Sequence, residues 1–558
     1  MFALALPLAF TFLVPSTSTN DASHKDSARA DHLEVTPQGA FVRTGRGLAV
    51  PSTGAAKSTA AGALWSYGDN GLAWIATAVS IGDRGGQVFT EFDQNSERAE
   101  LFSVYDTSPP TPVWTDTTPF GTEFRQVASA DAQPIHVAID QVVLGGQMTT
   151  RQAILRKYTS SSGTPDWTYT FAPVINAQSN VAISRDGQRI VAAIFDDTNW
   201  EVEIAVFAPG SNVPLSYTAV PTGTNGYLRG FDLSSDGSTL YFTGGTTAYL
   251  FDVASAQVVH TSPLNALFDS HAISGDGKVF ANGSFNAMYV WEKQGATWVN
   301  TFTRSVAGQC YCAEIDISDD GSTIASGWTF YSNYLTVRVE ALDVATKATT
   351  MSNVASGLGS KQNVIADVSI SADGKHFAVG VWGDAGGIVP ELRIFDRAQN
   401  APIATIDTPG SVFDVEISAD GKRAIAGSKA VHANDFGNGG RLDLLDAGGS
   451  DLALRGAPRI GATVQFDLHF TPGKNAFLMQ SLGEDPTPAT FPGIGTLHID
   501  RATLTFLPAG TVPAGGVATK SLSIANNPAL VGTSLYFQGF SVPPRQFSSD
   551  WIKMTILP

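Results

Sequence analysis

The side chains of this chain that could do chemistry are mainly carboxylates placed at regular positions. Six of them precede a repeated Ser-x-Asp-Gly tetrapeptide by two or four residues: Asp232, Glu314, Asp316, Asp367, Asp414 and Glu416. Residues two apart in a strand point to the same face, so these side chains share one register, away from the apolar residues between them. Carboxylate oxygens are ligands for hard cations. The pattern predicts a divalent cation site, with calcium the favoured ion, and leaves solvated polar positions as the alternative.

The sequence gives less support for catalysis or metal binding by histidine and cysteine side chains. The nine histidines are scattered, and the sequence contains neither a His-Glu-x-x-His nor a Gly-x-Ser-x-Gly motif. The two cysteines, Cys310 and Cys312, lie two residues apart. In a strand their Cα atoms would be about 6.5–7 Å apart, the long limit for a disulfide. A strained disulfide and two free thiols are both open, and zinc is disfavoured because further ligands are not close in sequence.

The carboxylates belong to a repeated unit. Six segments contain an alternating strand, then Ser-x-Asp-Gly, then a second apolar strand, with turn aspartates at Asp186, Asp236, Asp276, Asp320, Asp373 and Asp420. Two eroded copies surround Asp83 and Asp131, so successive copies are 40 to 55 residues apart. Asp-Gly favours a tight hairpin because glycine adopts positive φ without a Cβ clash. The period indicates one supersecondary unit that occurs about eight times.

A second signature gives each unit four strands. After the hairpin comes a strand that ends in an aromatic residue or leucine and then an acid, as at Asp252, Glu292 and Asp396. A four-stranded antiparallel sheet cannot bury both faces alone, so neighbouring sheets must pack against each other, as in a β-propeller. We therefore predict an all-β protein: a propeller of about eight blades over residues 64–454, followed by a small β-sandwich over 455–558, where the repeat ends.

These motifs carry a resemblance to known proteins. Ser-x-Asp-Gly followed by a strand ending in Phe-Asp or Trp-Glu resembles the WD-repeat and YVTN-type β-propeller superfamily across residues 64–454. The regular Gly-His dipeptide of true WD repeats is missing, which argues against their usual intracellular adaptor role. The tail resembles C-terminal modules of secreted bacterial repeat proteins, which implies an accessory or surface-attachment module. Because one fold hosts many functions, the resemblance implies architecture more than chemistry.

The N-terminal residues predict export. An apolar run from Phe2 to Val14 precedes small polar residues, the layout of a secretory signal peptide over residues 1–19. Residues 20–63 have the composition of a linker, in which the strand-like piece from His32 to Thr44 is expected to complete the last blade. No later segment has the length and apolar character of a transmembrane helix. We expect a secreted, periplasmic or cell-surface protein.

Composition narrows the partners. With 43% hydrophobic and 15% charged residues, the chain can build a core and is not expected to be disordered. Its net charge of −17 opposes attraction to phosphate backbones, so nucleic acid is not an expected partner. The favoured function is a non-enzymatic recognition or structural protein that binds a protein or polysaccharide through the propeller face. The alternative is a lactonase-like propeller hydrolase with a divalent metal at the channel mouth. Nothing in the sequence predicts an oligomeric state.

Overall fold

The computed structural model describes residues 32–35, 41–43, 63–68, 75–82, 84–93, 98–118, 122–144, 150–175, 178–223, 228–264, 270–432, 439–448 and 450–558. These residues form an all-β structure, with one 3₁₀ turn at Pro528–Leu530. None of the helical residues described forms a helix long and apolar enough to cross a membrane. The predicted signal peptide lies outside the described residues.

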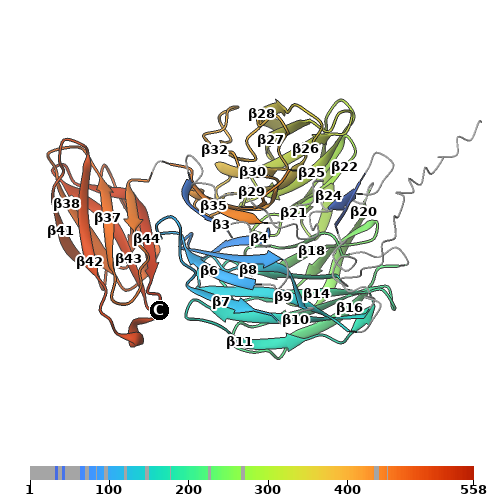
Figure 1. The fold of residues 1–558 in the computed structure, drawn as a ribbon, viewed down its shortest axis with the longest axis horizontal. Helices are drawn as coiled ribbons and strands as arrows, with labels where there is room; N and C mark the ends of the chain where they lie inside the picture. Colours follow the sequence, from blue (N-terminus) through green and yellow to red (C-terminus); the bar gives the residue numbers. More distant parts are fainter. Residues whose placement is uncertain are drawn as a thin grey trace, which may run out of the picture.

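The repeat region consists of antiparallel sheets that follow one another along the chain (Figure 1). Sheet 1 contains β4 (Ile75–Gly82), β5 (Gln87–Asp93), β6 (Arg98–Ser103) and β7 (Trp114–Thr117). Sheet 2 contains β8 (Thr122–Ser129), β9 (Ile135–Val143), β10 (Thr150–Thr159), β11 (Ser162–Thr170) and the short β12 (Val174–Ile175). Sheet 3 contains β13 (Gln178–Ile183), β14 (Ile190–Asp196), β15 (Glu201–Phe207) and β16 (Ser216–Pro221). Sheet 4 contains β17 (Phe231–Leu233), β18 (Thr239–Gly244), β19 (Thr247–Asp252) and β20 (Gln257–Pro263).

The later sheets repeat this order. Sheet 5 contains β21 (His271–Ile273), β22 (Val279–Ser284), β23 (Ala287–Gln294) and β24 (Thr297–Ser305). Sheet 6 contains β25 (Cys310–Ile317), β26 (Thr323–Phe330), β27 (Thr336–Asp343) and β28 (Ala348–Ser356). Sheet 7 contains β29 (Ile365–Ile370), β30 (His376–Val381), β31 (Leu392–Asp396) and β32 (Ala404–Ile406). Sheet 8 contains β33 (Val412–Ile417), β34 (Arg423–Lys429), β35 (Gly440–Asp446) and β3 (Ala63–Gly68).

The sheets pack against one another through apolar faces. One cluster joins Val191 and Ile204 of sheet 3 to Leu240 and Phe242 of sheet 4, and similar clusters join other neighbouring sheets. The first strand of each sheet contacts the first strand of the next. In sheet 8, β33 contacts β4 of sheet 1, so the succession of sheets closes on itself. Each sheet thus buries the faces that it could not bury alone.

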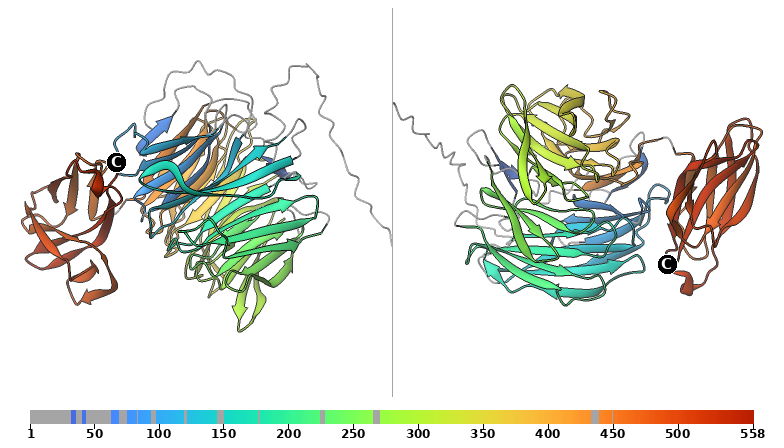
Figure 2. Two further views of the ribbon diagram at one scale, coloured as in Figure 1. Left: turned by 90° about the horizontal axis from the view of Figure 1, so that it is seen from below. Right: turned by 180° about the vertical axis from the view of Figure 1, so that it is seen from behind.

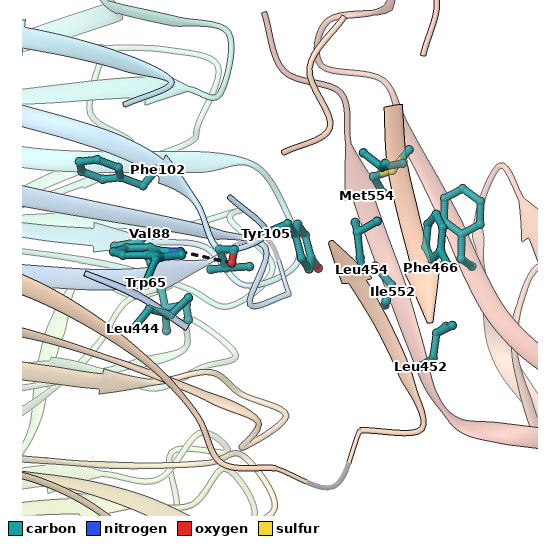
Figure 3. Close-up of a cluster of buried hydrophobic side chains, with 14 of the residues drawn as sticks. Trp65, Val88, Phe102, Tyr105, Leu444, Leu452, Leu454, Phe466, Ile552 and Met554 are labelled. Atoms are coloured by element: carbon teal, nitrogen blue, oxygen red, sulfur yellow. Dashed lines mark hydrogen bonds between the residues drawn. The ribbon is translucent and has the colours of Figure 1, made fainter. Parts of the chain in front are cut away.

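The closing strand comes from a different segment than predicted. β3 pairs with β35, with Trp65 opposite Leu444. The Trp65 indole is fully buried, donates from Nε1 to the Val104 carbonyl at 3.3 Å and packs against Phe102 of sheet 1 (Figure 3). The segment from His32 to Thr44 does not take this place, because β1 (His32–Val35) and β2 (Phe41–Arg43) pair with each other in a separate sheet. Both segments have the alternating pattern of a strand. Burial of the Trp65 indole between sheets 8 and 1 makes residues 63–68 the closing strand.

Residues 450–558, here called the tail, form three further sheets. The first contains β36 (Leu452–Arg455), β37 (Thr463–His469) and β42 (Val517–Ser523); the second contains β41 (Thr505–Thr511), β38 (Asn475–Ser481), β43 (Ser534–Val542) and β44 (Gln546–Thr555). A two-stranded hairpin contains β39 (Glu484–Phe491) and β40 (Gly495–Ile499). Leu454 and Phe466 of the first sheet share a core with Phe537 and Met554 of the second. The tail sheets begin at Leu452, three residues before the boundary predicted at 455.

The tail rests against the turns of sheets 8, 1 and 2 (Figures 1 and 2). Lys422 of sheet 8 forms an ion pair with Asp550. Arg84 of sheet 1 lies 2.6 Å from a Glu484 carboxylate oxygen, and Lys553 Nζ donates to the Ala132 carbonyl at 3.2 Å. Tyr105 lies between the two cores in Figure 3 and belongs to the apolar cluster that joins them. The tail therefore covers the region where the first and last sheets meet.

Candidate functional site

The repeated turns are held together by their own side chains. In sheet 4, Ser234 Oγ donates to Asp236 Oδ1 at 2.6 Å, and the Ser238 N–H donates to the same oxygen at 2.9 Å. Gly237 supplies the positive φ, at 70°. These contacts confirm that the turn aspartate stabilises the hairpin. The residue at position x of Ser-x-Asp-Gly takes no part in this side-chain network.

The x residues are linked to one another through their backbones. The Arg185 N–H donates to the Ser235 carbonyl at 2.9 Å, and the Asp319 N–H donates to the Ala372 carbonyl at 3.1 Å. Similar bonds connect every consecutive pair of turns from Arg84 in sheet 1 to Ala419 in sheet 8, with the N–H supplied by the x residue or by the residue after it. The turns therefore form a hydrogen-bonded series in which the x side chains are brought to one end of the first strands.

A polar pocket of about 220 Å³, here called the mouth pocket, lies at this end. All of the eight sheets contribute at least one lining residue. The x residues in its lining are Arg185, Ser235, Gly275, Asp319 and Ala419, and Asp131 takes the corresponding place in the irregular turn of sheet 2. Deeper lining residues include Ser129, Asp232, Asp316, Ser369 and Glu416. Carboxylates thus outnumber the single guanidinium around this pocket.

An ion pair crosses the rim of the mouth pocket. Arg185 of sheet 3 pairs with Asp319 of sheet 6, and Ser235 Oγ donates to Asp319 Oδ1 at 2.8 Å. Gly275 lies beneath this contact, where a Cβ atom would collide with the Asp319 side chain. The absence of a side chain at 275 therefore allows Asp319 to reach across to Arg185.

The six predicted carboxylates are divided between the mouth pocket and positions outside its lining. Each is half-buried and alternates with buried residues, as the strand register requires. Asp232, Asp316 and Glu416 line the mouth pocket, whereas Glu314, Asp367 and Asp414 do not. No three of the six have oxygens within 4.8 Å of one another; among the described residues, the acidic group that meets this distance is Asp196, Glu201 and Glu203 in sheet 3.

Most of these carboxylates accept a backbone N–H from the next sheet. Asp316 Oδ2 accepts from Ile370 at 2.7 Å, and Asp367 Oδ2 accepts from Val415 at 2.9 Å. Asp232, Asp414 and Glu416 make the same contact with Ile273, Val79 and Ile81. The first strand of each sheet has a hydrogen-bonded partner on one side only, so its other N–H groups need acceptors. Connecting neighbouring sheets is thus the structural role of these side chains.

The structure reveals residues of the same role that the search for carboxylates missed. Gln126 Oε1 accepts from the Val181 N–H at 3.0 Å, and Ser369 Oγ accepts from the Ile417 N–H at 3.1 Å. His271 Nε2 accepts from the Phe231 N–H at 2.9 Å and its ring stacks on Tyr241. For Gln126 and Ser369 the position in the strand register was the available signal, because an amide or a hydroxyl can accept a hydrogen bond there. His271 lies three residues before Ser274, outside this register, and accepts from the preceding sheet.

Burial disfavours ionisation of the three predicted carboxylates that line the mouth pocket. Desolvation raises the pKa of Glu416 to about 8 and raises the pKa of Asp316 well above its usual value. It also raises the pKa of Asp232. Burial disfavours the charged form of a carboxylic acid. A cation that enters the mouth pocket must therefore displace protons, and its binding should strengthen as the pH rises.

A buried serine–histidine pair lies beside the pocket. Ser129 Oγ is 2.9 Å from His136 Nδ1, and His136 Nε2 is 2.9 Å from Gln87 Oε1. A serine hydroxyl beside a histidine nitrogen is also the arrangement of a catalytic nucleophile and its general base. Desolvation and the nearby Lys157 and Lys553 lower the pKa of His136 to about 3, so the ring is a poor proton acceptor at neutral pH. We interpret the pair as part of the hydrogen-bonded core of sheet 2.

Of the two states left open for the cysteines, the structure has the free thiols. Cys310 and Cys312 are both free and buried. Asn286 Nδ2 lies 3.5 Å from Cys310 Sγ, whereas Ser270 Oγ lies 3.5 Å from Cys312 Sγ. The thiols thus have separate neighbours. Burial raises the pKa of Cys310 to about 11, so this thiol is not a ready nucleophile.

No family model matches this chain, and no curated protein matches it. The geometry of the mouth pocket is therefore the basis on which a function is assigned.

Proposed function

We propose that sheets 1 to 8 form an eight-bladed β-propeller of the WD-repeat and YVTN type, with the tail as a β-sandwich, and that this is an exported, non-enzymatic recognition protein. The closed succession of first strands supports the propeller, and the N-terminal apolar run supports export. The mouth pocket binds a cationic group carried by a protein or polysaccharide partner. The observation that carries this function is the placement of the variable x residues around one acidic pocket.

The charge of the pocket selects the class of ligand. Asp131 and Asp319 stand at its rim, and the whole chain carries a net charge of −17. A negative cleft attracts positive groups and speeds their association. Carboxylates spread around the pocket are better suited to an amine or guanidinium, which donates hydrogen bonds in several directions, than to a metal ion that needs close ligands. The size of the pocket, about 220 Å³, suits a single side chain or sugar unit rather than a whole partner.

The cation preference has a direct test by calorimetry with the full chain. We expect hexalysine and a glucosamine hexamer to bind, and the neutral N-acetylglucosamine hexamer to bind much more weakly. Asp319→Asn should weaken binding of the cationic oligomers by about fivefold, because one rim charge is lost. Asp166→Asn, an exposed aspartate on β11, is the matched control and should bind as the original chain does. Equal binding of charged and neutral oligomers would overturn the proposal.

Calcium binding stays a separate prediction. If the six predicted carboxylates hold a divalent cation, millimolar calcium should raise the midpoint of thermal unfolding and a chelator should lower it, because a ligand of the folded state stabilises that state. The double variant Asp316→Asn with Asp414→Asn should lose this response. A midpoint that calcium and chelator leave unchanged would restrict these carboxylates to their contacts with backbone N–H groups.

A further inference from the structure

The second sheet of the tail has two apolar faces. In β38, Ala476 and Leu478 point into the core shared with the first tail sheet, whereas Phe477 and Met479 point to the other side. The β39–β40 hairpin covers part of that outer face, where Leu497 and Ile499 pack on Met479. A strand that is apolar at every position is expected to be covered on both faces. The hairpin covers only one end of this face.

The remainder of the outer face forms a cavity of about 460 Å³, here called the tail cavity. Its walls carry five phenylalanines: Phe477, Phe491, Phe506, Phe540 and Phe547. Their rings form a connected series with centroid separations of 5.3 to 6.4 Å. Phe506 remains 51% exposed and Phe491 38% exposed. The cavity thus offers an aromatic lining that water still reaches.

Arg545 is the one charged residue in the lining of the tail cavity. It is exposed, in the turn between β43 and β44. Within the described part of the chain, its guanidinium has no ion pair and no hydrogen-bond partner. An anion bound at the rim would therefore find an available guanidinium with five N–H donors.

We propose that the tail cavity binds a single-chain anionic amphiphile, with its hydrocarbon chain among the phenylalanines and its carboxylate on Arg545. A volume of about 460 Å³ is in the range of small-molecule sites, which are mostly apolar with few polar groups. The apolar walls would contact the hydrocarbon chain of the ligand, and the Arg545 guanidinium at the rim would pair with its anionic head group. This site is separate from the mouth pocket and does not depend on the proposed function.

Chain length provides the first measurement. Because each methylene group buried gains about 0.8 kcal/mol, each additional methylene is expected to strengthen binding by up to about fourfold until the cavity is filled. The affinity of the full chain for octanoate, decanoate and dodecanoate, measured by calorimetry below their micelle concentrations, should increase in that order. Dodecanol should bind more weakly than dodecanoate, because it lacks the charge.

Three variants assign the site. Phe506→Ser should weaken dodecanoate and dodecanol alike, by about tenfold, whereas Arg545→Gln should weaken dodecanoate by about threefold and leave dodecanol unchanged. Leu482→Ser changes an apolar residue of the tail that is 64% exposed and does not line the cavity, and should have no effect. All three positions are exposed, so folding should persist.

Several outcomes would overturn the proposal. One is a failure of dodecanoate to bind, and another is equal binding of dodecanoate by all three variants. Self-association that Phe506→Ser abolishes, seen by analytical ultracentrifugation without added amphiphile, would assign the cavity to a second copy of this chain. Retention on phosphatidylglycerol vesicles without binding of free dodecanoate would assign it to a membrane surface.

Discussion

Replacing Trp65 by alanine is expected to lower the free energy of unfolding by about 3–5 kcal/mol, the usual cost of deleting a buried large aromatic side chain. The Trp65 side chain is fully buried between sheet 8, to which its strand belongs, and Phe102 of sheet 1. The substitution also removes the hydrogen bond to the Val104 carbonyl. Because this contact joins sheet 8 to sheet 1, its loss should weaken closure of the whole succession of sheets.

Urea denaturation of the full chain measures this effect. Leu64→Ala is the matched control, since Leu64 precedes Trp65 in the same strand and is 42% exposed. It should change the free energy of unfolding by less than about 0.5 kcal/mol. Equal effects of the two substitutions would mean that β3 does not close sheet 8. A deletion of residues 32–43 should have little effect on the same transition, because β1 and β2 pair only with each other among the described strands.

Replacing Glu416 by glutamine is expected to stabilise the protein at alkaline pH. The pKa of Glu416 is raised by burial from 4.5 to about 8. As the pH rises through this interval, the unfolded chain releases the proton while the folded protein retains it, so stability falls between about pH 4.5 and pH 8. Glutamine stays neutral and keeps an oxygen that can accept the Ile81 N–H. Above pH 8 the variant should therefore be more stable, by a free energy of about 4–5 kcal/mol.

Thermal unfolding across this pH range tests the expectation. The original chain should lose stability steadily as the pH rises, and the Glu416→Gln variant should lose less. Asp316 and Asp232, whose pKa values are also raised by burial, act in the same direction and keep some pH dependence in the variant. Asp166→Asn, on an outer strand, should follow the original profile. A variant whose profile is parallel to that of the original chain would contradict a buried, protonated Glu416.

The repeated turn was the part of the candidate site that could be predicted best. The spacing of Ser, Asp and Gly requires the local hairpin, because the Ser and Asp oxygens accept N–H groups within the same few residues. The residue at position x makes no side-chain hydrogen bond within its own turn, so the local motif does not constrain its type. Its importance depends on bonds between turns that are 40 to 55 residues apart in sequence, such as the Arg185 N–H to the Ser235 carbonyl.

For the six carboxylates, the sequence predicted the strand register but not the hydrogen-bond partners. Their strand register was predictable from alternation, and the half-buried positions of Asp316 and Asp414 agree with it. Their partners were not predictable, because the unpaired N–H groups of a first strand are presented by the neighbouring sheet. Convergence on one cation was therefore expected from register alone; the structure brings Asp232, Asp316 and Glu416 to the mouth pocket and gives most of the six carboxylates a backbone donor.

By itself, the sequence determined the features that arise within one repeat: the all-β character, the tight turns and the order of strands in each unit. These depend on alternation and on turn residues that act over a few positions. Only the tertiary structure decided which segment completes sheet 8, which x residues surround the mouth pocket and which face of β38 remains open beside Arg545. Each of these results depends on contacts between units, where many alternating strands satisfy the same local pattern and burial of particular side chains, such as Trp65, selects among them.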